Sequence, residues 1–155
     1  MADIERLTDL ATAALSRILT PLGFTYTCTV EPCEQDSITL MLESPDARFL
    51  IGDEGDRLED LQYLVNRMVQ AEWEDAPRVR VDCDRYRERA EAKLLRRARS
   101  RAERVLKTGK PLRMEELNAY QRRLVHHALA QIPGIRTESE QTESRFKRIT
   151  ISRAE

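Results

Sequence analysis

The chain has 155 residues, of which 41% are hydrophobic, so it can form one ordinary domain or two very small ones. It has no run near the ~20 apolar residues of a membrane span, and its acidic N-terminus is unlike a signal peptide, so we expect a cytoplasmic protein. The net charge of −1 conceals an uneven distribution: residues 1–84 carry 18 acidic and 7 basic side chains, and residues 85–155 carry 9 acidic and 19 basic ones. This asymmetry predicts two modules with different partners, and the basic one suits a polyanion.

The first 43 residues predict one helix followed by a β-hairpin. Apolar residues recur at helical spacing over residues 4–19, and a proline and a glycine follow. Residues 24–30 alternate between apolar and polar side chains, which is typical of a half-buried strand. After a turn over residues 32–36, a second strand is predicted over residues 37–43, with an inward face formed by Ile38, Leu40 and Leu42.

The next segment predicts a short helix, a glycine loop, a longer helix and a strand. The short helix covers residues 46–51 and leads into Gly-Asp-Glu-Gly at positions 52–55. Residues 78–83 alternate again and predict a third strand. The core face of the longer helix is predicted to consist of Leu58, Leu61, Leu64, Val65 and Met68.

The basic half is predicted to begin with a long helix. Asp84 is the predicted N-cap, and Gly109 ends the helix after Thr108. A short strand is expected over residues 111–114. The apolar stripe of the helix consists of Tyr86, Ala90, Leu94, Ala98, Ala102 and Val105.

A second helix and a final hairpin complete the basic half. Asn118 is the predicted N-cap of this helix, with Gln121 as its capping-box partner. The hairpin pairs residues 135–140 with residues 146–152, and its inward side chains are predicted to be Ile149 and Ile151.

Gly52 and Gly55 bracket a loop between two predicted helices, where a ligand backbone can approach closely and the next helix offers free N–H groups. The segment Phe-Leu-Ile-Gly-x-x-Gly-x-x-Leu-x-x-Leu-Gln-Tyr-Leu-Val-Asn at positions 49–66 resembles the KH domain of the Jag proteins, also called SpoIIIJ-associated, KhpB or EloR proteins. The resemblance covers about residues 23–83. It implies a loop that clamps the backbone of single-stranded nucleic acid.

The residues inside this loop differ from the basic or neutral ones usual in loops that hold RNA. Asp53 and Glu54 lie between the glycines, and Asp56 follows them. Their carboxylates oppose phosphate binding, whereas Arg48 and Arg57 partly compensate. Two alternatives therefore remain open: a loop that binds RNA, and a loop that keeps its shape without binding.

In the basic half, Arg122 and His126 are four residues apart on a predicted helix and project from the same face. A guanidinium beside an imidazole forms a compact anion site. Arg123 follows on the same helix. Further plausible phosphate contacts, from charge and position, are Lys110, Arg113, Lys147 and Arg148.

The surroundings of this pair resemble the R-3-H domain, which is named for its Arg-x-x-x-His motif and follows the KH domain in Jag proteins. The matching segments are Tyr-Arg-Glu-Arg from position 86, Thr-Gly-Lys-Pro from position 108, and Asn-Ala-Tyr-Gln-Arg-Arg from position 118. Ala119 and Gln121 replace a proline and a glutamate of the family motif, and both changes preserve a helix start. The resemblance implies helices on a three-stranded sheet that binds single-stranded nucleic acid, with Arg122 and His126 as the motif pair.

Together these patterns predict an α+β protein with two small domains. Residues 1–84 are expected to form a KH-like αββααβ domain, and residues 85–155 an R-3-H-like domain of a long helix, short strand, helix and hairpin. Many Jag proteins carry an additional N-terminal domain, which we expect to be absent here. The resemblance implies an RNA-binding bacterial protein and a post-transcriptional role linked to cell elongation and division.

Two alternatives to RNA binding remain: binding of single-stranded DNA, and an assembly role in which the acidic domain pairs with a second KH protein or with itself. An enzyme is not expected, because the sequence contains no nucleophile elbow, Walker loop or supported Cys/His pair. No cofactor or metal is expected either. Cys28, Cys33 and Cys83 lack a C-x-x-C pair and predict free thiols, and the alternative is a zinc site using His126 or His127.

Overall fold

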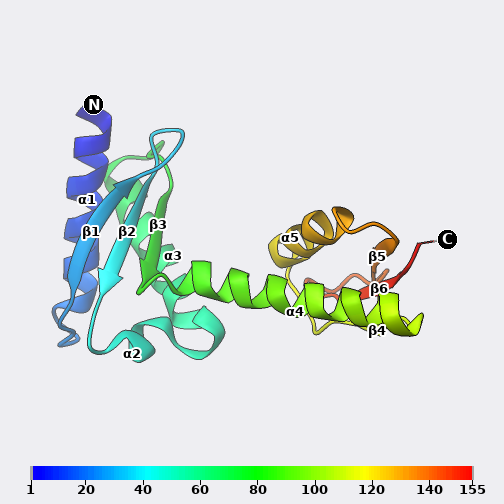
Figure 1. Cartoon of the computed structure of the whole chain (residues 1–155). Helices are drawn as coiled ribbons and strands as arrows, with labels where there is room; N and C mark the ends of the chain where they lie inside the picture. The colour runs from blue at the N-terminus through cyan, green and yellow to red at the C-terminus, as the bar shows by residue number, and fades with distance from the viewer. Residues whose placement is uncertain (1, 155) are drawn as a thin grey trace. The chain divides into compact units, whose positions relative to one another are not determined.

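The computed structural model describes residues 2–154. Contacts within the chain divide it into two compact units, an N-terminal unit of Met1–Arg87 and a C-terminal unit of Glu88–Glu155. Each unit has its own three-stranded sheet (Figure 1), so the predicted α+β class with small domains is confirmed. Within residues 2–154, no helix has both the length and the apolar character needed to cross a membrane.

The N-terminal unit has the predicted order of helix, two strands, helix, loop, helix and strand. Its elements are α1 (Ala2–Leu19), β1 (Thr27–Pro32), β2 (Ile38–Glu43), α2 (Ala47–Ile51), the 3₁₀ turn η1 (Asp53–Gly55), α3 (Asp56–Glu72) and β3 (Val79–Cys83).

The sheet of this unit has the order β1-β2-β3, with β1 antiparallel and β3 parallel to the central strand β2. The first strand starts at Thr27, three residues later than predicted, because Thr27 pairs with Glu43, the last residue of β2. Before that point the chain no longer has a strand partner, and the Ser44 hydroxyl donates to the Thr25 carbonyl at 2.6 Å instead.

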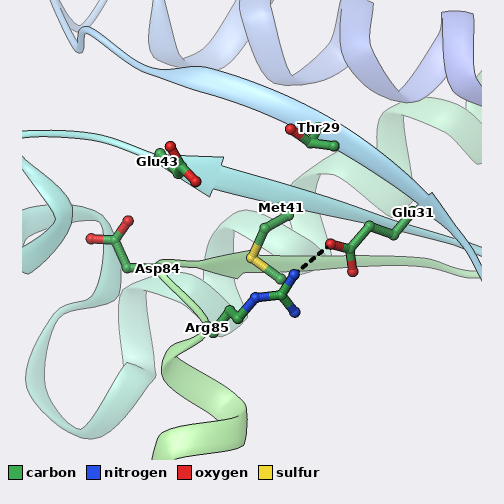
Figure 2. Close-up of a pocket in the computed structure, with 6 residues that line it drawn as sticks. All are labelled: Thr29, Glu31, Met41, Glu43, Asp84 and Arg85. Atoms are coloured by element: carbon green, nitrogen blue, oxygen red, sulfur yellow. Dashed lines mark hydrogen bonds and ion pairs between the residues drawn. The ribbon is translucent and has the colours of Figure 1, made fainter.

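The face of this sheet that points away from the core bears a shallow pocket (Figure 2). Arg85 reaches across it, and its Nη2 lies 2.9 Å from Oε1 of Glu31. Met41 lies beneath this ion pair and is only 8% exposed, although it projects from the solvent-facing side of β2. The pocket is lined by Thr29, Glu31, Met41, Glu43, Asp84 and Arg85.

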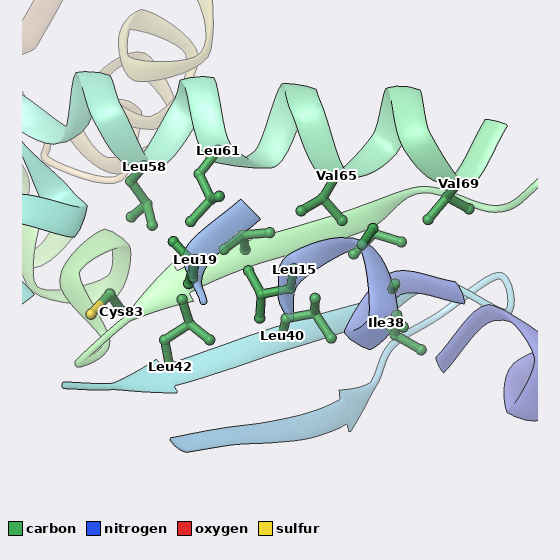
Figure 3. Close-up of a cluster of buried hydrophobic side chains, with 14 of the residues drawn as sticks. Leu15, Leu19, Ile38, Leu40, Leu42, Leu58, Leu61, Val65, Val69 and Cys83 are labelled. Carbon is green, nitrogen blue, oxygen red and sulfur yellow. The ribbon is translucent and has the colours of Figure 1, made fainter. Parts of the chain in front are cut away.

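The other face of the sheet forms the core with α1 and α3 (Figure 3). As predicted, Leu58, Leu61 and Val65 of α3 are buried there. The assignment of Leu64 to the core is wrong, because Leu64 lies about 100° around the helix from Val65 and is 47% exposed. Val69, one turn after Val65, is buried in its place.

Side chains of α3 and of the next helix, α4 (Tyr86–Thr108), form hydrogen bonds with the outer edge of β3. Asn66 accepts the Val79 N–H at 3.0 Å and donates to the Val79 carbonyl at 2.7 Å. Gln62 accepts the Val81 N–H at 3.0 Å, and Arg87 Nε donates to the Val81 carbonyl at 3.2 Å. These bonds occupy backbone groups that an incoming strand would need, so they protect this edge from strand addition.

The start of α4 (Tyr86–Thr108) differs from the prediction. Asp84 is not the cap: Asp84 and Arg85 have positive φ angles of 49° and 53° and form a turn before the helix. The carboxylate of Asp82 instead accepts the N–H groups of Cys83 at 2.8 Å and Arg87 at 3.3 Å.

The remaining elements are β4 (Leu112–Arg113), α5 (Ala119–Ala130), β5 (Ile135–Ser139) and β6 (Ile149–Arg153). The sheet has the order β4-β6-β5 and is antiparallel throughout. The predicted capping box is confirmed, since Asn118 and Gln121 each accept the backbone N–H of the other, at 2.9 and 3.0 Å. Ile149 and Ile151 face inward as predicted, in a core with Leu94, Ala98, Ala102, Val105, Met114, Leu117, Val125 and Leu129.

Candidate nucleic-acid interface

Arg122 lies on α5 and is anchored at one end of its guanidinium. Its Nη1 donates to the carbonyl of Leu117 at 2.9 Å and to the carbonyl of Arg145 at 3.4 Å. Leu117 also forms an isolated antiparallel bridge with Lys147, with N···O distances of 2.9 and 3.0 Å. Arg122 therefore ties α5 to the segment before β6, while its Nε–H and Nη2–H donors form no hydrogen bond among the described residues.

His126 lies one turn further along α5 and contacts β5 through both ring nitrogens. Nδ1 is 2.6 Å from the Thr137 hydroxyl, and Nε2 is 2.8 Å from the Ser139 hydroxyl. A neutral ring can satisfy this arrangement by donating to one hydroxyl and accepting from the other. Burial and the positive charge of Arg122 lower the pKa of His126, so the neutral form is favoured.

The predicted pair is thus held together between α5, β5 and the segment before β6. Lys147 belongs to the same region, because its backbone pairs with the residue whose carbonyl Arg122 binds. Arg148 follows; its N–H donates to Glu140 Oε2 at 3.1 Å and its guanidinium lies 3.8 Å from Glu116.

The other predicted contacts lie elsewhere on the C-terminal unit. Arg113 pairs with Thr150, which alternates with the buried Ile149 and Ile151, so Arg113 lies on the sheet face opposite the core. Lys110 is exposed in the connection between α4 and β4, and Arg123 is exposed on α5. The structure therefore brings together Arg122, His126 and Lys147 but separates them from Arg113.

The C-terminal unit contains a carboxylate clamp, Glu115 with two arginines, that the sequence analysis did not predict. Glu115 lies 2.8 Å from Arg97 and 2.6 Å from Arg101, and both arginines come from α4. Burial opposes ionisation of Glu115, but the Arg101 hydrogen bond, its own backbone N–H and the charges of both arginines together lower its pKa. The clamp holds the segment between β4 and α5 against α4. Because Glu115 is distant in sequence from both arginines, the pairing is visible only in the tertiary structure.

The glycine loop of the N-terminal unit is tightly built. Gly52 and Gly55 have φ angles of 74° and 83°, and Glu54 between them has a φ of 50°. A Cβ atom on Gly55 would lie 2.7 Å from the ring of Tyr86, and one on Gly52 would lie 2.2 Å from Asp56 Oδ1. Both positions therefore require glycine.

The acidic residues of this loop are exposed, as are the neighbouring basic ones. Asp53 and Glu54 form the tip of the loop. Arg57 Nη1 donates to the Phe49 carbonyl at 3.3 Å, and Arg48 stacks on the Phe49 ring at 4.5 Å. Both arginines therefore make contacts within the unit. These contacts lessen the extent to which the arginines can offset the negative charge of the loop.

The cysteines and histidines form no metal site within residues 2–154, where no group of three metal-ligating side chains is found. In the same part of the chain the three cysteines form no disulfide. Burial raises the pKa of Cys28. The alternative of a zinc site at His126 is further disfavoured by geometry, because both ring nitrogens contact hydroxyl groups.

Comparison with known proteins shows where the chain has relatives. Residues 92–153 match the R-3-H domain family. Over 149 residues the chain is 32% identical to the RNA-binding protein KhpB of Clostridium symbiosum, covering 96% of this chain and 67% of that protein. Over 102 residues it is 33% identical to the RNA-binding protein KhpB of Lactiplantibacillus plantarum, covering 66% of this chain and 32% of that protein.

Proposed function

Because the chain belongs to the KhpB family of RNA-binding proteins, we propose that it binds single-stranded RNA, mainly through its C-terminal unit. The observation that carries the proposal is the R-3-H match over residues 92–153, which covers nearly all of that unit. The unit also has 17 basic and 9 acidic residues, a net charge of +8, whereas the N-terminal unit has a net charge of −9. A polyanion is therefore attracted to one unit and repelled by the other.

In the proposed complex, Arg122 is the central phosphate ligand. Its Nη1 is held by two carbonyls, so the guanidinium is oriented before RNA arrives and less side-chain entropy is lost on binding. The Nε–H and Nη2–H edge then donates two parallel hydrogen bonds to a phosphate. Lys147, whose backbone pairs with Leu117, supplies further positive charge in the same region, and Arg148 follows it in the chain.

His126 has a supporting role in this proposal. Its two contacts hold β5 against α5, next to Arg122. A phosphate bound to Arg122 would offset the positive charge that now opposes protonation of the ring. RNA binding and protonation of His126 are therefore expected to favour each other.

The C-terminal unit has further phosphate contacts in this proposal: Lys110, Arg113 and Arg123. Arg113 lies on the opposite sheet face from Arg122, so a single strand must pass around the edge of the sheet to reach both. The proposal extends to single-stranded DNA, because nothing in the site identifies a 2′-hydroxyl contact. Its expected cellular role is that of an RNA-binding regulator in the cytoplasm, not that of an enzyme.

A second candidate function is protein assembly through the N-terminal unit, which we predict to be KH-like. The observation that favours it is the exposure of Tyr63 and Leu64, adjacent residues of α3 that are 64% and 47% exposed. Large apolar side chains exposed together are more common at interaction surfaces than elsewhere. Sedimentation of the whole chain with Tyr63→Ser and Leu64→Ser distinguishes this candidate, because an assembly face would lose its self-association or its partner.

Fluorescence anisotropy with a labelled single-stranded RNA tests the main proposal. Arg122→Ala combined with His126→Ala is expected to weaken binding severely. Arg104→Ala combined with His127→Ala is the matched control, since it removes the same residue types from exposed positions of the same unit. If the two double variants bind RNA equally well, with both folded by circular dichroism, the site assignment is wrong.

A further inference from the structure

Phe146 is an exposed aromatic residue within a run of cations. Its side chain is 51% exposed, and the run Arg145-Phe146-Lys147-Arg148 places three positive charges around it. Phenylalanine has no polar atom that would benefit from water, so this exposure is not explained by a hydrogen bond. Tyr120, equally exposed on α5, differs because its hydroxyl donates to Glu91 at 2.9 Å.

The backbone on both sides of Phe146 is held in place. The Arg145 carbonyl accepts from Arg122, and the Phe146 N–H donates to the Ser144 hydroxyl at 3.2 Å. On the other side, Lys147 makes both hydrogen bonds of its bridge to Leu117. The ring is therefore presented from a fixed backbone and has only its two side-chain torsions to order on contact.

We propose that Phe146 is a base-stacking residue: the flat face of one unpaired base packs on its ring while Arg122, Lys147 and Arg148 bind the adjoining phosphates. This rests on the proposed function and specifies how the same site selects its ligand. Aromatic side chains stack with any base, because every base has a π face. The ligand class is therefore a single strand with at least one unstacked base, with little preference for sequence.

This arrangement also gives the site a means of rejecting duplexes. In a double helix the bases are stacked on each other and unavailable, so only the phosphate contacts would remain. The positive charge of the site attracts duplexes and single strands alike, but only a single strand gains affinity from stacking on Phe146. Phe146 is thus a specificity-determining residue for strandedness.

The test compares two labelled strands of equal length, an oligouridylate and an abasic sugar–phosphate strand, by fluorescence anisotropy. Phe146→Ala is expected to weaken binding of the oligouridylate roughly 5-fold to 150-fold, the range for loss of one aromatic–base stack. Its binding of the abasic strand should equal that of the wild type. Phe146→Trp should restore oligouridylate binding, and Leu22→Ala, which removes an exposed large apolar side chain from the N-terminal unit, should leave the binding of both strands unaffected.

A direct readout uses Phe146→Trp in a chain with Trp73→Phe, so that the new indole is the single tryptophan. Stacking predicts quenching of its fluorescence by oligouridylate and none by the abasic strand. The inference is overturned if Phe146→Ala binds oligouridylate like the wild type, or if it weakens both strands equally, as loss of phosphate positioning would. If the wild-type chain binds neither strand, the proposed function itself fails.

Discussion

Replacing Asn66 with alanine should destabilise the N-terminal unit, because this side chain satisfies both backbone groups of Val79. Its Oδ1 accepts the Val79 N–H at 3.0 Å, and its Nδ2 donates to the Val79 carbonyl at 2.7 Å and to the Gln62 carbonyl at 2.8 Å. Val79 is fully buried. Asn66→Ala therefore leaves an N–H and a carbonyl at the sheet edge without their partner.

The magnitude follows from the number of groups left without a partner. Each buried backbone group that loses its hydrogen bond costs about 1–3 kcal/mol. Asn66 itself is half-buried, so water can reach part of the vacated space and reduce this cost. We expect a loss of about 2 kcal/mol in the free energy of unfolding, near the lower end of the sum of two such groups.

Urea unfolding followed by Trp73 fluorescence measures this loss. Trp73 is the single tryptophan and packs against the core of the same unit, so its signal reports that unit. Gln70→Ala is the matched control, since it removes an exposed amide from the same helix. A change below about 0.5 kcal/mol, within the range of ordinary surface substitutions, would refute the role given to Asn66.

Replacing Asp53 and Glu54 together with lysine should tighten RNA binding up to about tenfold, measured by fluorescence anisotropy. The reason is that the net charge near a bound phosphate changes by four units at ~6 Å in screened solvent. An unchanged affinity would show that the glycine loop does not contact the RNA. Burial and Arg122 lower the folded-state pKa of His126, so the unfolded state binds protons more readily and stability should fall as the pH drops below about 6.5. Thermal unfolding at several pH values should show this loss in the wild type and less of it in His126→Gln; equal pH profiles would contradict it. The lowered pKa of Glu115 means that its contribution is present above its ordinary pKa and is lost as the pH falls through the folded-state value. Glu115→Gln should therefore lower the free energy of unfolding by about 1–2 kcal/mol at pH 7, measured by circular dichroism, and an unchanged melting temperature would count against the clamp.

Two matched controls support these predictions. Glu5→Lys with Asp9→Lys makes the same charge change on exposed positions of α1, and should alter RNA binding less than the loop variant does. His127→Gln replaces the neighbouring exposed histidine, and should leave the pH dependence of stability as it is in the wild type.

The helices and strands follow from local periodicity because each buries one face. The alternation in β2 and the helical spacing in α4 were sufficient to predict Leu40, Leu42, Ala98 and Ala102 as buried. Periodicity fails at the margins of a face: Leu64 lies at the border of the apolar stripe of α3, and only the packing of that helix decides that it is exposed.

Features that depend on turn geometry or on packing between elements could not be predicted from the sequence. Asp84 has the right residue type for a cap, but the turn before α4 moves it out of position and Asp82 caps the helix from within β3. The contacts of His126 with two strand hydroxyls require knowing that β5 packs beside α5. The capping box at Asn118 was predictable, because both partners lie within one helical turn.

The motif pair on α5 was predictable as a pair but not in its orientation. The four-residue spacing places Arg122 and His126 on one face. It does not reveal that each anchors a neighbouring segment, Arg122 through two carbonyls and His126 through two hydroxyls. These contacts hold both side chains in defined orientations within the C-terminal unit.

The salt dependence of RNA affinity tests the central claim most directly. Each phosphate neutralised on a single strand contributes about −0.7 to the slope of log K against log salt concentration. With Arg122, Lys147 and Arg148 engaged, the wild-type slope should be about −2 or steeper, and Lys147→Ala with Arg148→Ala should make it shallower by about 1.4. A wild-type affinity that does not change with salt, or a slope that the double variant leaves unchanged, would contradict RNA binding through this site.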